Sequence, residues 1–182
     1  IKIADAALKV LPFIEKNFGK YPYPQDSFIH GGDGGMEYPM ATLLSSASLG
    51  TAIHEWMHSW YQMMLGTNES LYAWMDEGFT SYAESLVTAY YNGWPDMANY
   101  EDALKKRPSD EALRNMVKNI LPLEHTGAYN SYFNLVQSGL EEPLTTHADY
   151  FNTNAAYSPA AYSKGEVLME QLGYIVGAAS RD

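Results

Sequence analysis

The stretch that decides the fold reads His54-Glu55-Trp56-Met57-His58, inside an apolar-periodic segment from about Thr51 to Leu65 that Gly66 closes. This spacing predicts an α-helix, and residues four apart on a helix project from one face about one turn apart. Two imidazoles on that face can bind a single ion, with the Glu55 carboxylate beside it. The stretch therefore predicts a metal site carried by a helix.

A third metal ligand is expected on the following helix, predicted from about Tyr72 to Tyr91. Zinc in hydrolases usually has three protein ligands and one open position, and a chain without cysteine must supply them from His and carboxylate. Glu77 stands nineteen positions after His58, in Trp74-Met75-Asp76-Glu77-Gly78-Phe79. An antiparallel return of the chain brings its carboxylate to the imidazoles. The neighbouring Asp76 is interpreted as a solvated charge outside the site.

The competing interpretation of these residues is a buried, hydrogen-bonded histidine pair with Glu77 as a surface charge. A bare H-E-x-x-H pattern arises by chance in about one per cent of chains of this composition. The glutamate that follows at the right distance favours the metal site. His30, His125 and His147 lack ligand spacing, and we expect them to be structural or exposed.

Composition restricts the classes of function. With 182 residues and 46% hydrophobic residues the chain is expected to form one globular domain. The formal charge of -11 argues against nucleic acid or anionic lipid as a partner. No run reaches the roughly 18 to 20 apolar residues of a bilayer span, so no membrane span is expected in this segment. The chain starts at Ile1 without an initiator methionine, so we expect a fragment of a longer multidomain protein.

The remaining elements predict an α+β, mostly helical fold with a small mixed β-sheet. A helix is predicted over residues 4–18, and two short strands around a glycine-rich turn, at Phe28-Ile29 and at 36–44. Short helices are expected between residues 96 and 146, for example behind Ser109. The last helix is predicted to begin with Ser158 as its N-cap.

Three motifs together resemble one protein family. They are the H-E-x-x-H pattern with its glutamate in W-x-x-E-G-F, the run Gly34-Gly35-Met36-Glu37-Tyr38, which resembles G-x-M-E-N, and Ala161-Tyr162-Ser163-Lys164-Gly165, which resembles Y-x-K-G. Their order and spacing are similar to the gluzincin aminopeptidases, the family of aminopeptidase N and leukotriene hydrolase. The resemblance implies a thermolysin-like catalytic domain over residues 1–182 that removes N-terminal residues from peptides.

Four residues are expected to bind the metal or to act on its water, and a fifth to stabilise the oxyanion. His54, His58 and Glu77 are the expected ligands of one Zn²⁺ ion. Glu55 is placed to accept the proton of the attacking water and to pass it to the leaving amine. The resemblance implies that Tyr162 donates a hydrogen bond to the oxyanion of the substrate.

Substrate recognition is assigned to the glycine-rich strand. Glu37 would bind the free α-ammonium of a peptide, and Gly34, Gly35 and Met36 would hold the substrate backbone like an added strand. Tyr157 is a second candidate for substrate contact. Glu84, close to two helical turns beyond Glu77, resembles the family glutamate that orients a metal-bound histidine.

Three features depart from the family, and two other functions stay open. The stretch Trp60-Tyr61-Gln62-Met63 replaces the W-x-G-N run that commonly follows the zinc helix. Tyr38 stands where the family has Asn, and the N-terminal and C-terminal domains that usually complete the substrate site lie outside these residues. One alternative is a metallopeptidase that cleaves internal bonds or hydrolyses an epoxide. The other is a zinc-binding scaffold without turnover in isolation. The resemblance also favours an exported or periplasmic bacterial protein.

Overall fold

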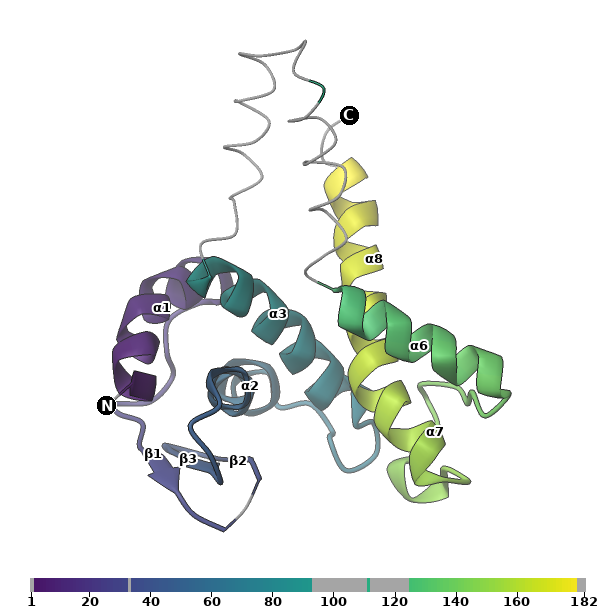
Figure 1. Cartoon of the computed structure of the whole chain (residues 1–182), viewed down its shortest axis with the longest axis horizontal. Helices are drawn as coiled ribbons and strands as arrows, with labels where there is room; N and C mark the ends of the chain where they lie inside the picture. The colour runs from purple at the N-terminus through teal and green to yellow at the C-terminus, as the bar shows by residue number, and fades with distance from the viewer. Residues whose placement is uncertain (1, 33, 93–110, 112–124, 180–182) are drawn as a thin grey trace.

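The computed structural model of the chain describes residues 2–32, 34–92, 111 and 125–179. Helices make up most of these residues, and three short strands form one small sheet (Figure 1). The predicted class, α+β and mostly helical with a small mixed sheet, is confirmed. Among the described residues no helix is both long enough and apolar enough to cross a membrane.

The sheet contains three strands in the order β1-β3-β2: β1 (Phe28–His30), β2 (Met36–Tyr38) and β3 (Ala41–Leu44). Strand β1 pairs with β3 in parallel, and β2 pairs with β3 in antiparallel fashion. Strands do form at both predicted stretches on either side of the glycine-rich segment, but the predicted number of two is wrong. The chain reverses at Met40, whose φ is +64°, and this tight turn splits the second predicted strand in two. The glycine-rich loop instead joins β1 and β2 across β3.

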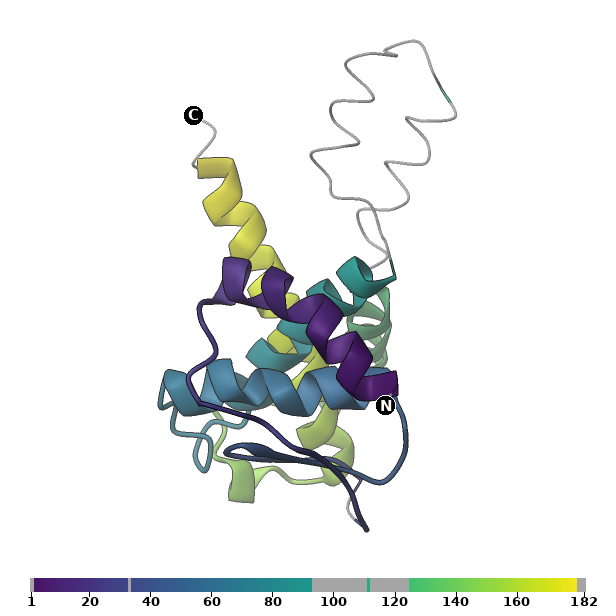
Figure 2. The same ribbon diagram turned by 90° about the vertical axis from the view of Figure 1, so that its left-hand side faces the viewer.

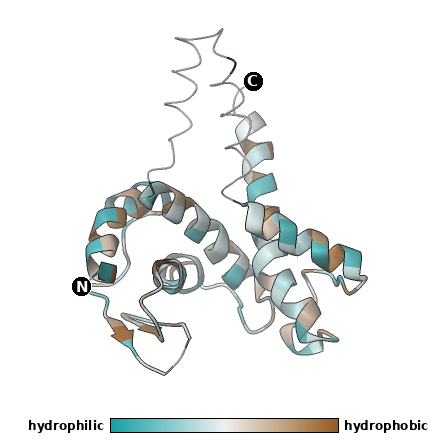
Figure 3. Cartoon of the chain, in the orientation of Figure 1, coloured by the Kyte–Doolittle hydropathy of each residue, from teal (hydrophilic) through white to brown (hydrophobic). Residues whose placement is uncertain are grey.

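Helix α1 (Lys2–Phe18) lies against the core through a stripe of three buried side chains, Ala6, Val10 and Ile14. The helix alternates hydrophobic and hydrophilic residues along its length (Figure 3), as expected for a helix with one buried face. Pro12 lies on the exposed side and the helix continues through it. Gly19, with φ of +100°, ends the helix.

Helix α2 (Leu49–His58) runs through the middle of the molecule, between the sheet on one side and helices α1 and α3 on the other (Figure 2). It begins at the N-cap Ser48, whose Oγ accepts a hydrogen bond from the Thr51 amide at 3.3 Å. A π-helical segment, η1 (Ser59–Met64), continues it. The core packs around α2 and contains Ile53, Trp56, Met57 and Trp60.

The second predicted helix starts later than expected, at Trp74. A π-helical turn, η2 (Trp74–Gly78), leads directly into α3 (Phe79–Tyr91), which ends at Asn92. The helix predicted behind Ser109 lies outside the described residues.

The C-terminal part contains α6 (Thr126–Ser138), a short 3-10 turn η3 (Ala148–Tyr150), and one long helical rod. The rod joins α7 (Asn154–Pro159), the π-helical η4 (Ala160–Lys164) and α8 (Gly165–Ala179). The prediction of Ser158 as N-cap is wrong, because Thr153 caps the rod and its Oγ1 accepts from the Ala156 amide at 3.0 Å. Ser158 lies inside the helix.

Candidate metal centre

The two histidines of α2 face the same side of the helix and are buried. His54 is 8% exposed and His58 is 1% exposed. Their ring centroids lie 5.0 Å apart with planes at 79°, the separation expected for side chains one helical turn apart. Two nitrogens therefore face one point from a rigid element.

Glu77 on η2 lies close to both histidines and is the third member of this group. Its Oε2 lies 3.0 Å from Nε2 of His54 and 3.5 Å from Nε2 of His58. The three side chains offer one ligand atom each within 4.8 Å of one another. Donor atoms that are each about 2.0 to 2.2 Å from a shared zinc ion must lie within about 4.4 Å of one another, so the separations of Glu77 from both histidines suit such an ion. Two imidazoles and a carboxylate are also the ligand chemistry of hydrolytic zinc sites, so these residues fit zinc.

Each histidine has an acidic partner on its other nitrogen. Nδ1 of His54 lies 3.0 Å from Oε2 of Glu84. Nδ1 of His58 lies 2.6 Å from Oδ1 of Asp76, an ion-pair contact rather than an aligned hydrogen bond, and 3.2 Å from Oγ1 of Thr80. Such partners fix the orientation of an imidazole so that the nitrogen facing the ion is the acceptor.

The charges of this group perturb one another strongly. Burial lowers the pKa of His54, but hydrogen bonds to Glu77 and Glu84 outweigh it and raise the pKa to about 9. Burial likewise lowers the pKa of His58, and its contacts with Asp76 and Glu77 raise it to about 10. Burial raises the pKa of Glu77, while the hydrogen bonds from both histidines lower it to about 2. The carboxylates thus create a negative pocket that favours a cation or protonated histidines.

Glu55 lies beside this group, under the glycine-rich segment that leads into β2. A Cβ added to Gly35 would collide with Oε1 of Glu55 and lie 2.9 Å from its Cδ. The absence of a side chain at position 35 therefore leaves the room that this carboxylate occupies. Gly34, by contrast, has nothing within 4 Å of an added Cβ.

The environment of Glu55 shifts its titration toward neutral pH. Burial raises the pKa of Glu55 to about 7, the neighbouring histidines oppose that shift, and Glu37 reinforces it. A carboxyl group with such a pKa can both accept and release a proton near neutral pH.

Glu37 lies on the edge strand β2, which runs beside α2. Its carboxylate belongs to a second group of possible ligand atoms, shared with His58 and Asp76, in which all atoms lie within 4.8 Å. The structure thus brings Glu37 close to His58 and Asp76. Met36, the preceding residue of the strand, is partly buried and pairs with Leu43 on β3.

Tyr162 enters the site from η4. Its ring stacks on that of His54, with centroids 5.7 Å apart and planes at 23°. Burial and the charge of Glu77 raise the pKa of the phenol, so it keeps its proton and can donate a hydrogen bond. The hydroxyl-bearing side chain is still 37% exposed, so it is open to a ligand.

A glycine contact brings η2 and η4 together. A Cβ added to Gly78 would lie 2.7 Å from Cα of Gly165, and one added to Gly165 would lie 2.8 Å from Cα of Gly78. Gly78 directly follows Glu77, and Gly165 closes the segment that carries Tyr162. Both glycines therefore allow a close backbone approach that sets a ligand candidate next to the tyrosine.

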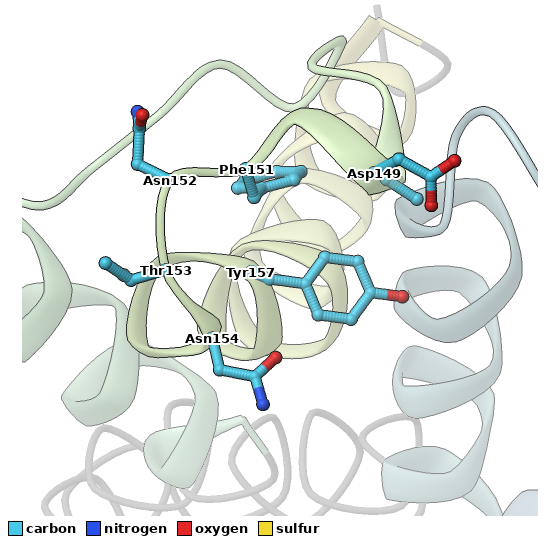
Figure 4. Close-up of a pocket in the computed structure, with 7 residues that line it drawn as sticks. Asp149, Phe151, Asn152, Thr153, Asn154 and Tyr157 are labelled. Carbon is cyan, nitrogen blue, oxygen red and sulfur yellow. The ribbon is translucent and has the colours of Figure 1, made fainter.

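Tyr157 lies one helical segment earlier, on α7, at the wall of an open pocket that residues 148, 149 and 151–154 also line. Figure 4 shows Phe151 above the Tyr157 ring and Asn154 below it, with Asn152 further away beyond Phe151. The two aromatic rings meet edge to face, with centroids 5.4 Å apart. Burial raises the pKa of Tyr157, and the negative charges of Glu77 and Asp76 raise it further.

The sequence interpretation missed Asp76 and Thr80. Asp76 was expected to be a solvated charge, and that expectation is wrong: the residue is 7% exposed and contacts His58. The reason is the π-helical turn η2, which turns Asp76 and Glu77 toward the same helix. In the sequence, only the position of Asp76 directly before Glu77 could have indicated that Asp76 contacts His58. Of the other histidines, His30 is exposed, His147 is partly exposed and His125 is buried.

Comparisons of the chain with protein-family models, with curated proteins and with solved structures find no match. The function therefore has to be argued from the arrangement of the site itself.

Proposed function

We propose that this chain is the catalytic domain of a zinc-dependent aminopeptidase with a thermolysin-like fold, related to the gluzincin aminopeptidases. The convergence of His54, His58 and Glu77 on one point carries the proposal. The helical elements that present them come from two separate segments of the chain, and each histidine has an acidic partner behind it. A structural histidine pair would need neither the third convergent carboxylate nor a further glutamate, Glu55, beside it.

The metal would be held by His54, His58 and Glu77. A zinc ion there would lower the pKa of a water molecule toward about 7 and polarise the scissile carbonyl. Glu84 and Asp76 hold the histidine rings so that their Nε2 atoms face Glu77.

Glu55 is the proposed proton carrier. Its carboxylate lies beside the histidines and its pKa of about 7 allows it to take a proton from water and give it to the leaving amine. General acid–base catalysis of this kind contributes about 10²- to 10⁴-fold to the rate. Tyr162 keeps its proton and can donate to the negative charge that develops on the carbonyl oxygen of the substrate.

Glu37 is the proposed recognition group for a free N-terminus. It lies on the edge strand of the sheet, next to the metal-site residues, where a carboxylate can pair with the α-ammonium of a peptide. A substrate with an acylated N-terminus would leave this partly buried carboxylate unpaired. The free edge of β2 in the described sheet offers backbone groups to a peptide strand, and nothing lies within 4 Å of a Cβ at the preceding Gly34.

The test is hydrolysis of a panel of aminoacyl-naphthylamides by the zinc-loaded chain, with the matching N-acetylated compounds as controls and Glu55→Gln as the inactive reference. The proposal expects cleavage of free-amine compounds only. Glu37→Gln should raise KM for these compounds by about tenfold or more, because a charged hydrogen bond to the ammonium is lost. Equal cleavage of acetylated compounds would contradict the aminopeptidase assignment while leaving a hydrolase.

A further inference from the structure

A second group of polar side chains is buried behind the candidate metal centre, where α3, α6 and α8 meet. Glu166, in the first turn of α8, is 8% exposed, and its Oε1 accepts a hydrogen bond from Oγ of Ser85 on α3 at 2.6 Å. The same oxygen lies 2.7 Å from Nδ1 of His125, the residue before α6, which is 5% exposed. The His125 ring stacks on Tyr82 of α3, with centroids 5.2 Å apart and planes at 7°.

These contacts link three helices through one carboxylate. A buried carboxylate is costly unless it is hydrogen-bonded, so its partners fix where it can sit. The partners of Glu166 come from two other elements, α3 and the start of α6. The start of α8 is therefore tied to both, and a shift of α8 along α3 would break these bonds.

The network adjoins the candidate metal centre on two sides. Tyr162 lies one helical turn before Glu166 on the continuous rod of η4 and α8 (Figure 1). Ser85 directly follows Glu84, whose carboxylate contacts His54. The position of the Tyr162 turn relative to the histidines thus depends on how α8 lies against α3.

We propose that Glu166, held by Ser85 and His125, is a positioning residue that fixes the Tyr162 hydroxyl relative to the metal-site residues. The proposal rests on the proposed function, since Tyr162 matters for catalysis only if the chain is a hydrolase. Tyr162 is 37% exposed, and its ring stacks only on that of His54 among the described aromatic contacts. A displacement of about 1 Å in a catalytic group can cost about 10²-fold in rate. The Tyr162 hydroxyl is hydrogen-bonded to the Glu77 side chain, and the anchoring of α8 at Glu166 fixes the helical segment that brings the hydroxyl there.

The test is a double-mutant cycle of Glu166→Gln and Tyr162→Phe, assayed by kcat and KM on a free-amine naphthylamide with zinc content measured in each protein. Glu166→Gln alone is expected to lower kcat about 10- to 100-fold with KM within about twofold and zinc unchanged. In the Tyr162→Phe background the same change is expected to lower kcat less than about twofold, because its effect is transmitted through the hydroxyl. Equal losses in both backgrounds would overturn the proposal.

A matched control lies one turn further along α8. Glu170 accepts a hydrogen bond from the Tyr129 hydroxyl of α6, so it joins α8 to α6, two of the three helices of the Glu166 network, without adjoining the candidate site. Glu170→Gln is expected to change kcat less than about twofold. Ser85→Ala, which removes one bond and leaves the carboxylate in place, is expected to lower kcat in the same direction as Glu166→Gln and by less. A loss in Glu170→Gln as large as in Glu166→Gln would show a general effect of the helix contact and overturn the proposal.

A second readout needs neither zinc nor turnover. With 3-fluorotyrosine introduced at Tyr162, the fluorine resonance of the metal-free protein reports the stacking of this ring on His54. We expect Glu166→Gln to shift or broaden it and Glu170→Gln to leave it unchanged. If the wild-type chain hydrolyses nothing, the proposed function fails and this spectrum alone decides the positioning role. An unchanged resonance in Glu166→Gln overturns it.

Discussion

Replacing Gly35 by alanine should damage catalysis while leaving the fold and the metal site in place. The added Cβ would collide with Oε1 of Glu55, and would lie 2.9 Å from its Cδ and 3.2 Å from Cγ2 of Thr51. The backbone at Gly35 does not require a positive φ, so alanine itself is tolerated there. The flexible end of the Glu55 side chain must therefore move.

The size of this effect follows from the role of Glu55. A shift of about 1 Å costs about 10²-fold, and complete loss of a general base costs about 10²- to 10⁴-fold. We expect Gly35→Ala to lower kcat about 100-fold with one bound zinc per chain retained. The free energy of unfolding should fall by less than about 2 kcal/mol, because the added Cβ displaces only the flexible end of Glu55 and presses on one methyl group of Thr51.

The assay is kcat on the preferred naphthylamide, measured with zinc content and urea denaturation of the same samples. Gly34→Ala is the matched control, because nothing lies within 4 Å of a Cβ at that position. Its kcat should stay within about twofold of the wild type. Normal turnover in Gly35→Ala, or equal losses in both variants, would refute the placement of Glu55 beneath this segment.

Three further predictions concern the metal centre and the packing around it. Asp76→Asn should weaken zinc binding about 10- to 100-fold in a chelator competition, because the carboxylate on Nδ1 of His58 orients that ring; Asp5→Asn, an exposed control, should not change it. Gly78→Ala should lower the free energy of unfolding by about 1 to 3 kcal/mol, since its Cβ would meet facing backbone at 2.7 Å; Gly127→Ala, with open space around it, should be neutral or stabilising. In the metal-free protein, both site histidines have pKa values raised from 6.5 to about 9 and about 10, so the stability they contribute is complete below about pH 6.5 and is lost as pH rises through 9 to 10. Urea denaturation of EDTA-treated protein from pH 6 to 10 measures this loss, and stability that rises over that range would contradict it.

Local periodicity explains why the helices could be predicted. The i, i+4 spacing of His54 and His58 is a property of one helix and needs no knowledge of the rest of the fold. The C-terminal ends of α1 and of the α2–η1 helix could be predicted from the sequence, because glycine commonly ends a helix and Gly19 and Gly66 take positive φ values there. The placement of Glu77 near the histidines could also be predicted, because only residues 65–73 join η1 to η2, although α3 crosses α2 at a steep angle rather than running antiparallel to it (Figure 1).

Non-local packing explains what the sequence did not reveal. The parallel pairing of β1 with β3 joins segments separated by a loop and a hairpin, and no turn motif specifies it. The last rod begins after Thr153 rather than at Ser158. Pro159 could not reveal this, because it lies inside the helix, which continues into η4, and not in its first turn. The burial of Asp76 depends on a π-helical turn that no residue pattern announces. The contact of Gly78 with Gly165 likewise appears only when both helices are placed.

The central claim is that His54, His58 and Glu77 hold one catalytic zinc ion, and zinc content tests it most directly. The measurement is metal per chain by mass spectrometry after dialysis against a weak chelator, for the wild type, Glu77→Gln and the exposed control His30→Ala. We predict about one zinc per chain in the wild type and in His30→Ala, and a large loss in Glu77→Gln. A wild-type chain that retains no zinc, or a Glu77→Gln chain that retains as much as the wild type, would contradict the account.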